Sequence, residues 1–354
     1  MKKSVLLFTI AAVLLPVLAG GCNKTAAAPE RKISFGMATD VGGLGDKSFN
    51  DGAWQGLVEA GEQYGAEAIV VESKQQTDYV PNLTGLAEDG NQLVVAVGFL
   101  MEEAVKETAR HNPDTFFAGV DIGSNPGDPP NFQGIVYNEH EASYLAGVFA
   151  GLMTRQYASR VPGKLNNANV IGVVLGMLVP AVERYEVGYI AGAKSVNPDI
   201  TVLSVVTDTF SDLNKAKESA AAMISQGADI IFAAAGAAGL GAINAADEGG
   251  VLAIGCDLDQ NDVAPGTIIT SALKNVPRST FLVAESVVNN TFQGGTAVYS
   301  IQEDAVGLAG FHQFDSQVPQ EVKDKIAQTI LDMKAGNIHI PTTRAELESL
   351  GIRR

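Results

Sequence analysis

TDVGGLGDKSFNDGAW, residues 39–54, lies between a hydrophobic strand pattern at residues 33–38 and an amphipathic helix pattern that begins at Ser48. A strand that leads through a polar, glycine-rich turn into a helix places side chains and free N–H groups at the C-terminal edge of a parallel sheet. Open α/β sheets bind ligands at that edge. The glycines allow positive φ angles, and Ser48 is expected to cap the helix. The side chains that remain to meet a ligand are those of Asp40, Phe49 and Asn50.

The same stretch comes close to two nucleotide-binding motifs and matches neither of them. In the dinucleotide motif G-x-G-x-x-G, Ser48 would occupy the third glycine position. In the phosphate-binding motif G-x-x-x-x-G-K-[ST], Lys47 and Ser48 fit, but Val41 and Asp46 replace both glycines. Asp46 would also repel a phosphate. A tight turn without a ligand therefore stays an alternative to a binding site.

The first residues have the composition of a secretory signal. Lys2 and Lys3 precede an almost wholly apolar run at residues 5–18, and small residues at 19–21 lead to Cys22. A membrane-spanning helix would need about 20 apolar residues, so a cleavable signal fits the run better.

A cysteine directly after small residues resembles the bacterial lipoprotein signal. The resemblance implies that residues 1–21 are removed and that Cys22 is lipidated and becomes the mature N-terminus. The alternative is an ordinary signal cut near residues 26–28. Residues 22–32, rich in alanine, are expected to form a flexible tether.

The charge balance excludes two classes of partner. The chain has 24 basic and 40 acidic residues and a net charge of -16, which argues against binding to nucleic acid or to anionic membrane surfaces. Cys256 is the only cysteine after Cys22, so we expect no disulfide between them and a packed, inert thiol at Cys256. The histidines form no pair with metal-ligand spacing, so we expect no metal site and no cofactor.

About 320 residues follow the tether, more than one hydrophobic core usually organises, so two domains are expected. Strand and helix patterns alternate from residue 33 to 120 and again from residue 169 to 255. Successive βα units build a parallel, doubly wound α/β sheet. The sequence therefore predicts one architecture used twice.

The last segment contains more elements than the second sheet needs. A strand at residues 268–274 is followed by a helix at 277–289 and a strand at 297–301. In the simplest arrangement this helix and strand return to the first lobe, which gives three hinge crossings near residues 138, 273 and 303. The predicted lobes are residues 33–138 plus 274–302 (N-terminal) and residues 139–273 plus 303–354 (C-terminal).

Chemically active side chains follow several of the predicted strands. Asp121, Phe210 and Asp257 each come soon after an apolar strand pattern, and Lys274 ends a crossing strand. If the two lobes face each other, these side chains point into the cleft between them, together with Asp40 and the 39–54 stretch. Three carboxylates and two aromatic rings predict a polar pocket with aromatic walls.

A neutral nucleoside satisfies the groups of such a pocket. Carboxylates only accept hydrogen bonds, so they suit sugar hydroxyls. Two phenylalanine faces suit a flat ring, because stacking contributes about 1–3 kcal/mol per base. Lys274 and Asn50 can meet ring oxygens and nitrogens. A nucleotide would bring its phosphate against the carboxylates, whereas a bare sugar would make less use of the rings.

Ordered motifs along nearly the whole chain resemble the basic membrane protein family of lipoproteins, the substrate-binding components of ABC importers, and above all its purine nucleoside receptors. The motifs are TD and DKSFN within 39–50, DYVP at 78–81, VD at 120–121, NE at 138–139, NPDI at 197–200, TFSD at 209–212, the turn at 236–241, GxDxDQ at 255–260, SxxK at 271–274 and AVG at 305–307.

This resemblance implies a two-lobed type I periplasmic-binding-protein fold and a role for each site residue. Phe49 and Phe210 would sandwich the purine, and Asp40 and Asp257 would face ribose hydroxyls or the base edge. The remaining hydrogen bonds would come from Asp121, Lys274 and the backbone of Gly236. Asn50 either contacts the ligand or holds the start of its helix.

The sequence as a whole predicts a binding protein rather than an enzyme, since it offers no nucleophile–base pair. We expect a monomer, anchored to the cell membrane by the lipid on Cys22 and facing the periplasm or the exterior. It would capture a nucleoside, preferably a purine, by hinge closure and pass it to ABC permease and ATPase subunits. The alternatives are a ribose- or galactose-type sugar-binding protein, a ligand sensor for a membrane receptor, and a nucleoside hydrolase or nucleotide-dependent oxidoreductase; both failed glycine motifs disfavour the enzymes.

Overall fold

The computed structural model describes residues 32–353 of the chain. Cys22, the predicted signal at residues 1–21 and all but the last residue of the predicted tether lie outside the described residues. Residues 33–354 form one compact unit.

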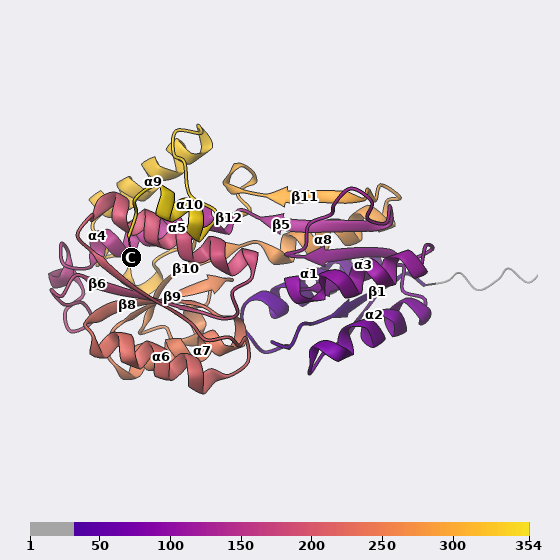
Figure 1. The fold of residues 1–354 in the computed structure, drawn as a ribbon, viewed down its shortest axis with the longest axis horizontal. Helices are drawn as coiled ribbons and strands as arrows, with labels where there is room; N and C mark the ends of the chain where they lie inside the picture. Colours follow the sequence, from indigo (N-terminus) through magenta and orange to yellow (C-terminus); the bar gives the residue numbers. More distant parts are fainter. Residues whose placement is uncertain (1–31, 354) are drawn as a thin grey trace, which may run out of the picture. The chain divides into compact units, whose positions relative to one another are not determined.

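The unit contains two six-stranded sheets (Figure 1). The first has the strand order β11-β5-β4-β3-β1-β2 and consists of β1 (Ser34–Ala38), β2 (Glu67–Val71), β3 (Leu93–Val97), β4 (Phe116–Val120), β5 (Phe132–Tyr137) and β11 (Gly295–Tyr299). The second has the order β12-β10-β9-β8-β6-β7 and consists of β6 (Val170–Leu175), β7 (Thr201–Val206), β8 (Ala228–Ala234), β9 (Leu252–Asp257), β10 (Ile268–Lys274) and β12 (Val306–Leu308). The two orders are equivalent strand for strand, which confirms the predicted α/β architecture used twice.

One pair of neighbouring strands runs antiparallel. Every pair of neighbouring strands is parallel except β10 and β12, which run antiparallel with Lys274 opposite Val306. The predicted fold of two doubly wound, mainly parallel sheets is confirmed, and only β12 was not predicted, because it has three residues and shows no periodicity of its own.

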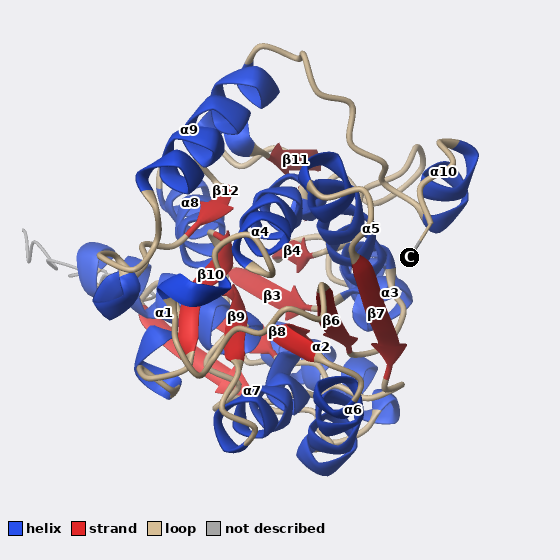
Figure 2. Cartoon of the chain, turned by 90° about the vertical axis from the view of Figure 1, so that its left-hand side faces the viewer, coloured by secondary structure: helices blue, strands red, loops and turns tan. Residues whose placement is uncertain are grey.

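Helices cover both faces of each sheet (Figures 1 and 2). Those beside the first sheet are α1 (Phe49–Tyr64), α2 (Tyr79–Glu88), α3 (Glu102–His111) and α8 (Val276–Val288). Those beside the second are α4 (Glu139–Met153), α5 (Pro180–Val196), α6 (Leu213–Ser225), α7 (Gly239–Glu248), α9 (Gln320–Lys334) and α10 (Arg344–Ser349). Figure 2 shows α6 and α7 on one side of the second sheet and α4 and α5 on the other.

The hydrophobic core explains why the central strands lack alternation. All five residues of β3 (LVVAV) are buried, because α2 and α3 pack on one face of the first sheet and α1 and α8 on the other. Strands covered on both faces read as continuous apolar runs. β11, at the edge of the first sheet, is mostly exposed or half-buried.

The chain passes between the two sheets three times: between β5 and β6, between β10 and β11, and between β11 and β12. These passages agree with the three predicted crossings, whereas the residue boundaries of the lobes stay a prediction. Among the described residues, no helix combines the length and the apolar character that crossing a membrane requires.

Candidate functional site

A cavity lies at the C-terminal ends of strands from both sheets, with about 590 Å³ of space that protein atoms do not fill, open solvent included. All eight residues predicted to bind a ligand line it, namely Asp40, Phe49, Asn50, Asp121, Phe210, Gly236, Asp257 and Lys274. The lining residues that were not predicted as ligand-binding are Gly42, Asp46, Gly98, Phe99, Leu100, Val179, Ala181, Val182, Tyr185, Ala234 and Cys256. The structure thus brings the predicted residues together, while their roles toward a ligand stay predictions.

Asp121 and Asp257 occupy equivalent places in the two sheets. Asp121 directly follows β4 and Asp257 ends β9, which is the corresponding strand of the second sheet. Both residues have a φ angle of 63°, in the left-handed region that non-glycine residues rarely adopt. This shared conformation turns each carboxylate from its strand end toward Lys274, at the end of β10.

The ammonium group of Lys274 is the electrostatic centre of the cavity. Its Nζ lies 2.9 Å from Asp121 Oδ2, 3.4 Å from Glu139 Oε1 and 3.7 Å from Asp257 Oδ1. The side chain is only 2% exposed. Burial alone would lower the pKa of Lys274, but the attraction of Asp121, Asp257 and Glu139 outweighs it and raises that pKa, so the lysine stays charged.

Three buried carboxylates surround this single cation, and the pKa of one of them is therefore raised. Burial raises the pKa of Asp121 to about 7; Lys274 opposes the rise, and the charges of Glu139 and Asp257 add to it. Glu139 also accepts a hydrogen bond from Arg184 Nε at 2.5 Å. The site thus carries more acid than base, which disfavours anionic ligands.

A second network fixes the start of α1. The carboxylate of Asp46 accepts hydrogen bonds from the backbone N–H groups of Ser48 (3.0 Å), Asn50 (2.7 Å) and Asp51 (3.1 Å). Ser48 occupies the N-cap position but its side chain makes no capping bond. The predicted capping role of Ser48 was therefore wrong, because the Asp46 carboxylate, two residues earlier, accepts hydrogen bonds from the free N–H groups instead.

The amide of Asn50 is oriented by two carboxylates. Its Nδ2 donates to Asp40 Oδ1 (3.1 Å) and to Asp46 Oδ2 (3.3 Å). Burial raises the pKa of Asp40 and raises the pKa of Asp46 to about 6. Asn50 Oδ1 is buried and has no hydrogen-bond partner among the described residues. It is therefore an unpaired acceptor beside the cavity, which a donor group of a ligand could satisfy once the side chain turns toward it.

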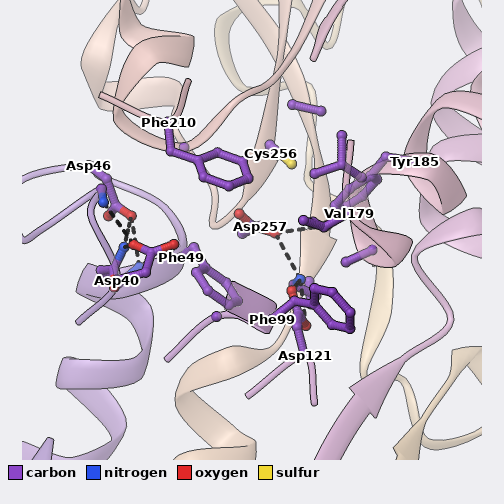
Figure 3. Close-up of a pocket in the computed structure, with 18 of the residues that line it drawn as sticks. Asp40, Asp46, Phe49, Phe99, Asp121, Val179, Tyr185, Phe210, Cys256 and Asp257 are labelled. Atoms are coloured by element: carbon purple, nitrogen blue, oxygen red, sulfur yellow. Dashed lines mark hydrogen bonds and ion pairs between the residues drawn. The ribbon is translucent and has the colours of Figure 1, made fainter. Parts of the chain in front are cut away.

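Phe49 and Phe210 lie on opposite sides of the Asp257 carboxylate in the close-up view (Figure 3). The Phe210 ring lies against Gly176, where an added Cβ would come within 2.4 Å of two ring atoms. Glycine at this position is thus required for the ring to enter the cavity. Lys274 Nζ lies 4.7 Å from the centroid of the Phe49 ring, within cation–π range.

Tyr185 and Ser48 hold the Asp257 carboxylate from two sides. The Tyr185 hydroxyl donates to Asp257 Oδ1 (2.8 Å), and the Ser48 hydroxyl donates to Oδ2 (2.6 Å). Tyr185 lies on α5, which approaches α4 so closely that a Cβ at Gly188 would come within 2.3 Å of the His140 carbonyl oxygen. This packing brings Tyr185 and Glu139 to the cavity.

Sequence reasoning missed the roles of Asp46, Glu139 and Tyr185. Asp46 had a usable signal, since an acidic residue just before a helix pattern is a capping candidate. Glu139 and Tyr185 lie inside helix patterns, and their direction depends on how α4 and α5 pack. Within residues 32–353, no group of His, Cys, Asp and Glu side chains is arranged to hold a metal ion.

Comparison with known proteins gives concordant matches along most of the chain. The family model described as "ABC transporter substrate-binding protein PnrA-like" matches residues 33–342. Basic membrane protein A of Borreliella afzelii is 33% identical over 80% of this chain and 84% of its own length. The ABC transporter nucleoside-binding protein BmpA of Lactococcus lactis is 30% identical over 97% of this chain and 100% of its own length.

A solved structure supports the same fold. An ABC transporter solute-binding protein from Aeropyrum pernix K1 superposes with a TM-score of 0.81 at 25% identity, over 88% of this chain and 94% of that one. An arabinose-binding protein from Geobacillus stearothermophilus, at 14% identity and a TM-score of 0.58, shares the fold alone.

Proposed function

Because the chain belongs to the PnrA-like family of ABC transporter substrate-binding proteins, we propose that it binds a nucleoside, preferably a purine, in the cavity between its two sheets. It acts as the binding component of an importer and not as an enzyme. The proposal extends to a lipid anchor on Cys22 and to delivery of the ligand to a membrane permease with its ATPase subunits.

The observation that carries this proposal is the pairing of two aromatic rings with hydrogen-bonding groups between them. Phe49 and Phe210 flank the space beside Asp257 (Figure 3). A base stacked between the rings would place its ribose hydroxyls toward acceptors, since Asp121 and Asp257 retain free lone pairs. A base N–H would meet Asn50 Oδ1 once this side chain turns toward the cavity, since the buried oxygen has no protein partner.

Two further observations support a neutral nucleoside as the ligand. The excess of carboxylates over the single ammonium group of Lys274 opposes a phosphate. The relative from Lactococcus lactis carries the name of a nucleoside-binding protein.

The cavity wall favours binding over covalent chemistry. Its thiol, Cys256, is 4% exposed, and burial raises its pKa well above the ordinary value, with Asp257 adding to the rise. The thiol therefore stays protonated and unreactive at neutral pH.

Capture proceeds by closure of two lobes, taken as residues 33–138 plus 274–302 and residues 139–273 plus 303–354. A ligand that touches both lobes stabilises the closed form by the difference between its affinities for the closed and open forms. Lys274 ends β10, after which the chain passes to the first lobe. Its ammonium group contacts Asp121, beside the first sheet, and Asp257, in the second.

Calorimetric titration tests the proposal. The Cys22→Ser protein, freed of bound ligand by unfolding and refolding, is titrated with adenosine, guanosine, inosine, uridine and ribose. Micromolar or tighter binding of purine nucleosides with little heat from ribose is the expected result. Binding of ribose alone would make this a sugar receptor, and no heat from any of the five would overturn the proposed ligand class.

A further inference from the structure

The start of α1 is hydrogen-bonded to the end of β9 and to the segment that follows it. Ser48 is buried, with 1% of its surface exposed. Its hydroxyl lies 2.6 Å from Asp257 Oδ2 and 3.0 Å from the carbonyl oxygen of Cys256. A few residues later, Gln260 Nε2 donates to the carbonyl oxygen of Lys47 at 3.1 Å. Both bonds join an element beside the first sheet to the second sheet, and both use protein atoms alone.

Gln260 is held in place by its own side of the cavity. Its backbone N–H donates to Ser271 Oγ (3.1 Å), and its Oε1 accepts from the Cys256 N–H (2.9 Å). The residue is 4% exposed, and it lies so close to Gly255 that a Cβ there would come within 2.8 Å of Oε1. Of the Gln260 side chain, only Nε2 makes a hydrogen bond outside the second sheet, and it donates to the Lys47 carbonyl oxygen.

The backbone at both ends of the contact is conformationally costly. Lys47 has a φ angle of 54° and Asp257 one of 63°, and neither residue is glycine. Left-handed conformations of such residues persist only where their surroundings fix them. The Lys47 carbonyl is fixed by Gln260, and the Asp257 carboxylate by Ser48 and Tyr185.

The segment after β9 is also tied to the C-terminal part of the chain. His312 Nε2 lies 2.7 Å from Asp259 Oδ2, and Asn261 Nδ2 donates to Gln313 Oε1 at 3.3 Å. On the facing side, Gly52 of α1 leaves room for Leu258, since an added Cβ would lie 3.2 Å from Leu258 Cδ2. The segment is thus a fixed surface of the second sheet that fits closely against α1.

We propose that Ser48 and Gln260 form a latch that stabilises the closed arrangement of the two lobes through protein atoms alone, in addition to the ligand. Neither residue lines the cavity, so the latch acts on closure and not through ligand contact. Ser48 also orients the Asp257 carboxylate, which keeps lone pairs free for a ligand. The further consequence, that the latch slows ligand release, rests on the proposed function.

Each bond of the latch should shift the closed-to-open ratio measurably. A hydrogen bond to a charged group or between buried neutral groups is worth roughly a tenfold change in an equilibrium constant. Removing both bonds should shift the ratio by more than either removal alone.

Single-molecule fluorescence transfer without nucleoside tests the latch directly. The full chain with Cys22→Ser carries dyes at Lys74→Cys, after β2, and at Lys215→Cys, in α6; both positions are exposed and Cys256 is buried. We expect the protein with Ser48 and Gln260 intact to exchange between open and closed forms, with a measurable closed fraction. Ser48→Ala and Gln260→Ala should each lower the closed-to-open ratio about tenfold.

The matched control is Ser195→Ala, because the Ser195 hydroxyl donates to the Gly192 carbonyl within its own helix. This control should leave the ratio unchanged. Equal distributions in the unaltered protein and both latch variants, or an unaltered protein without a closed fraction, would overturn the latch. The two variants lie on opposite sides of the contact, so a folding defect in one leaves the other decisive.

The measurement uses no nucleoside, so its failure is distinguishable from failure of the proposed function. Where the titration shows purine binding, stopped-flow release of inosine adds a second readout. The release rate should rise about tenfold in Gln260→Ala. An unchanged release rate would contradict the role of the latch in residence time.

Discussion

At the scale of single residues, the cavity assigns different tasks to aromatic and acidic side chains. The acidic groups also bind protein partners: Asp121 binds Lys274, and Asp257 binds Ser48 and Tyr185. The Phe210 ring, in contrast, rests on Gly176 and lines the cavity. Substitution of the ring should therefore report on the ligand's flat base more cleanly than substitution of a carboxylate would.

Phe210→Ala should weaken inosine binding by about ten- to a hundredfold, because stacking on one ring contributes about 1–3 kcal/mol. Ribose, which has no flat ring, should show no comparable loss. The measurement is calorimetric titration of both ligands. Phe311→Ala is the control, since Phe311 stacks on Phe149 and does not line the cavity. Equal losses for inosine and ribose would argue against a stacking role.

At the scale of elements, α1 depends on Asp46 for its first turn. Asp46 is fully buried and accepts three backbone N–H groups, so its loss leaves buried donors without partners. Asp46→Ala should lower the free energy of unfolding by about 1–3 kcal/mol. Urea unfolding followed by circular dichroism measures this change.

Asp212→Ala provides a matched comparison for the cap. Asp212 caps α6 by accepting from the N–H groups of Asn214 and Lys215, but it is exposed. Its loss should cost less than the loss of Asp46, because water can satisfy the released donors. An Asp46→Ala protein that is as stable as Asp212→Ala would rule out the buried cap.

The sequence predicted those elements whose own residues determine them. The apolar run of β3 and the turn-and-helix pattern after β1 specify a parallel α/β sheet locally. Strand-end residues such as Asp121 and Asp257 were predicted for the site because parallel strands bring their carboxyl ends to one edge. β12 escaped prediction because three residues carry no period, and its pairing with β10 is decided by the tertiary fold.

The residues that were missed depend on contacts between helices. Tyr185 and Glu139 reach the cavity because glycines let α4 and α5 approach closely, a contact between segments about 40 residues apart. Ser48 was assigned to its own helix, whereas its hydroxyl binds a residue 209 positions away. Local patterns cannot show such partners, since the choice between a near and a distant acceptor is made only in the folded chain.

At the scale of the whole molecule, the two halves meet at a cluster in which charge is unbalanced. Lys274 joins Asp121, Glu139 and Asp257, so one lysine serves three buried carboxylates, and Arg184 neutralises part of the excess through Glu139. Because this cluster joins both sheets, its protonation should affect the stability of the whole unit.

The sign of that effect follows from the raised pKa of Asp121. Its pKa rises from 3.8 to about 7, so the folded protein holds a proton that the unfolded chain has released, and stability is lost as the pH rises through 7. The lowered pKa of His140, about 4 instead of 6.5, because of burial, acts in the opposite direction as the pH rises through 6.5. The raised pKa values of Asp46 and Asp229, each about 6, add a smaller fall. The part that belongs to Asp121 is therefore the difference between the unaltered protein and a variant that lacks this titration, within the window from pH 6.5 to 8.

Between pH 6.5 and 8, the free energy of unfolding should fall by about 1 kcal/mol through the proton released from Asp121. Asp121→Asn keeps the shape of the side chain and cannot titrate, so its unfolding free energy should lack this part of the pH dependence. Urea unfolding of both proteins at several pH values within the window measures the two slopes. Parallel slopes would show that Asp121 is ionised throughout and that the proton is held elsewhere. A steeper fall in the unaltered protein would show that the acid cluster between the two sheets holds a proton near neutral pH.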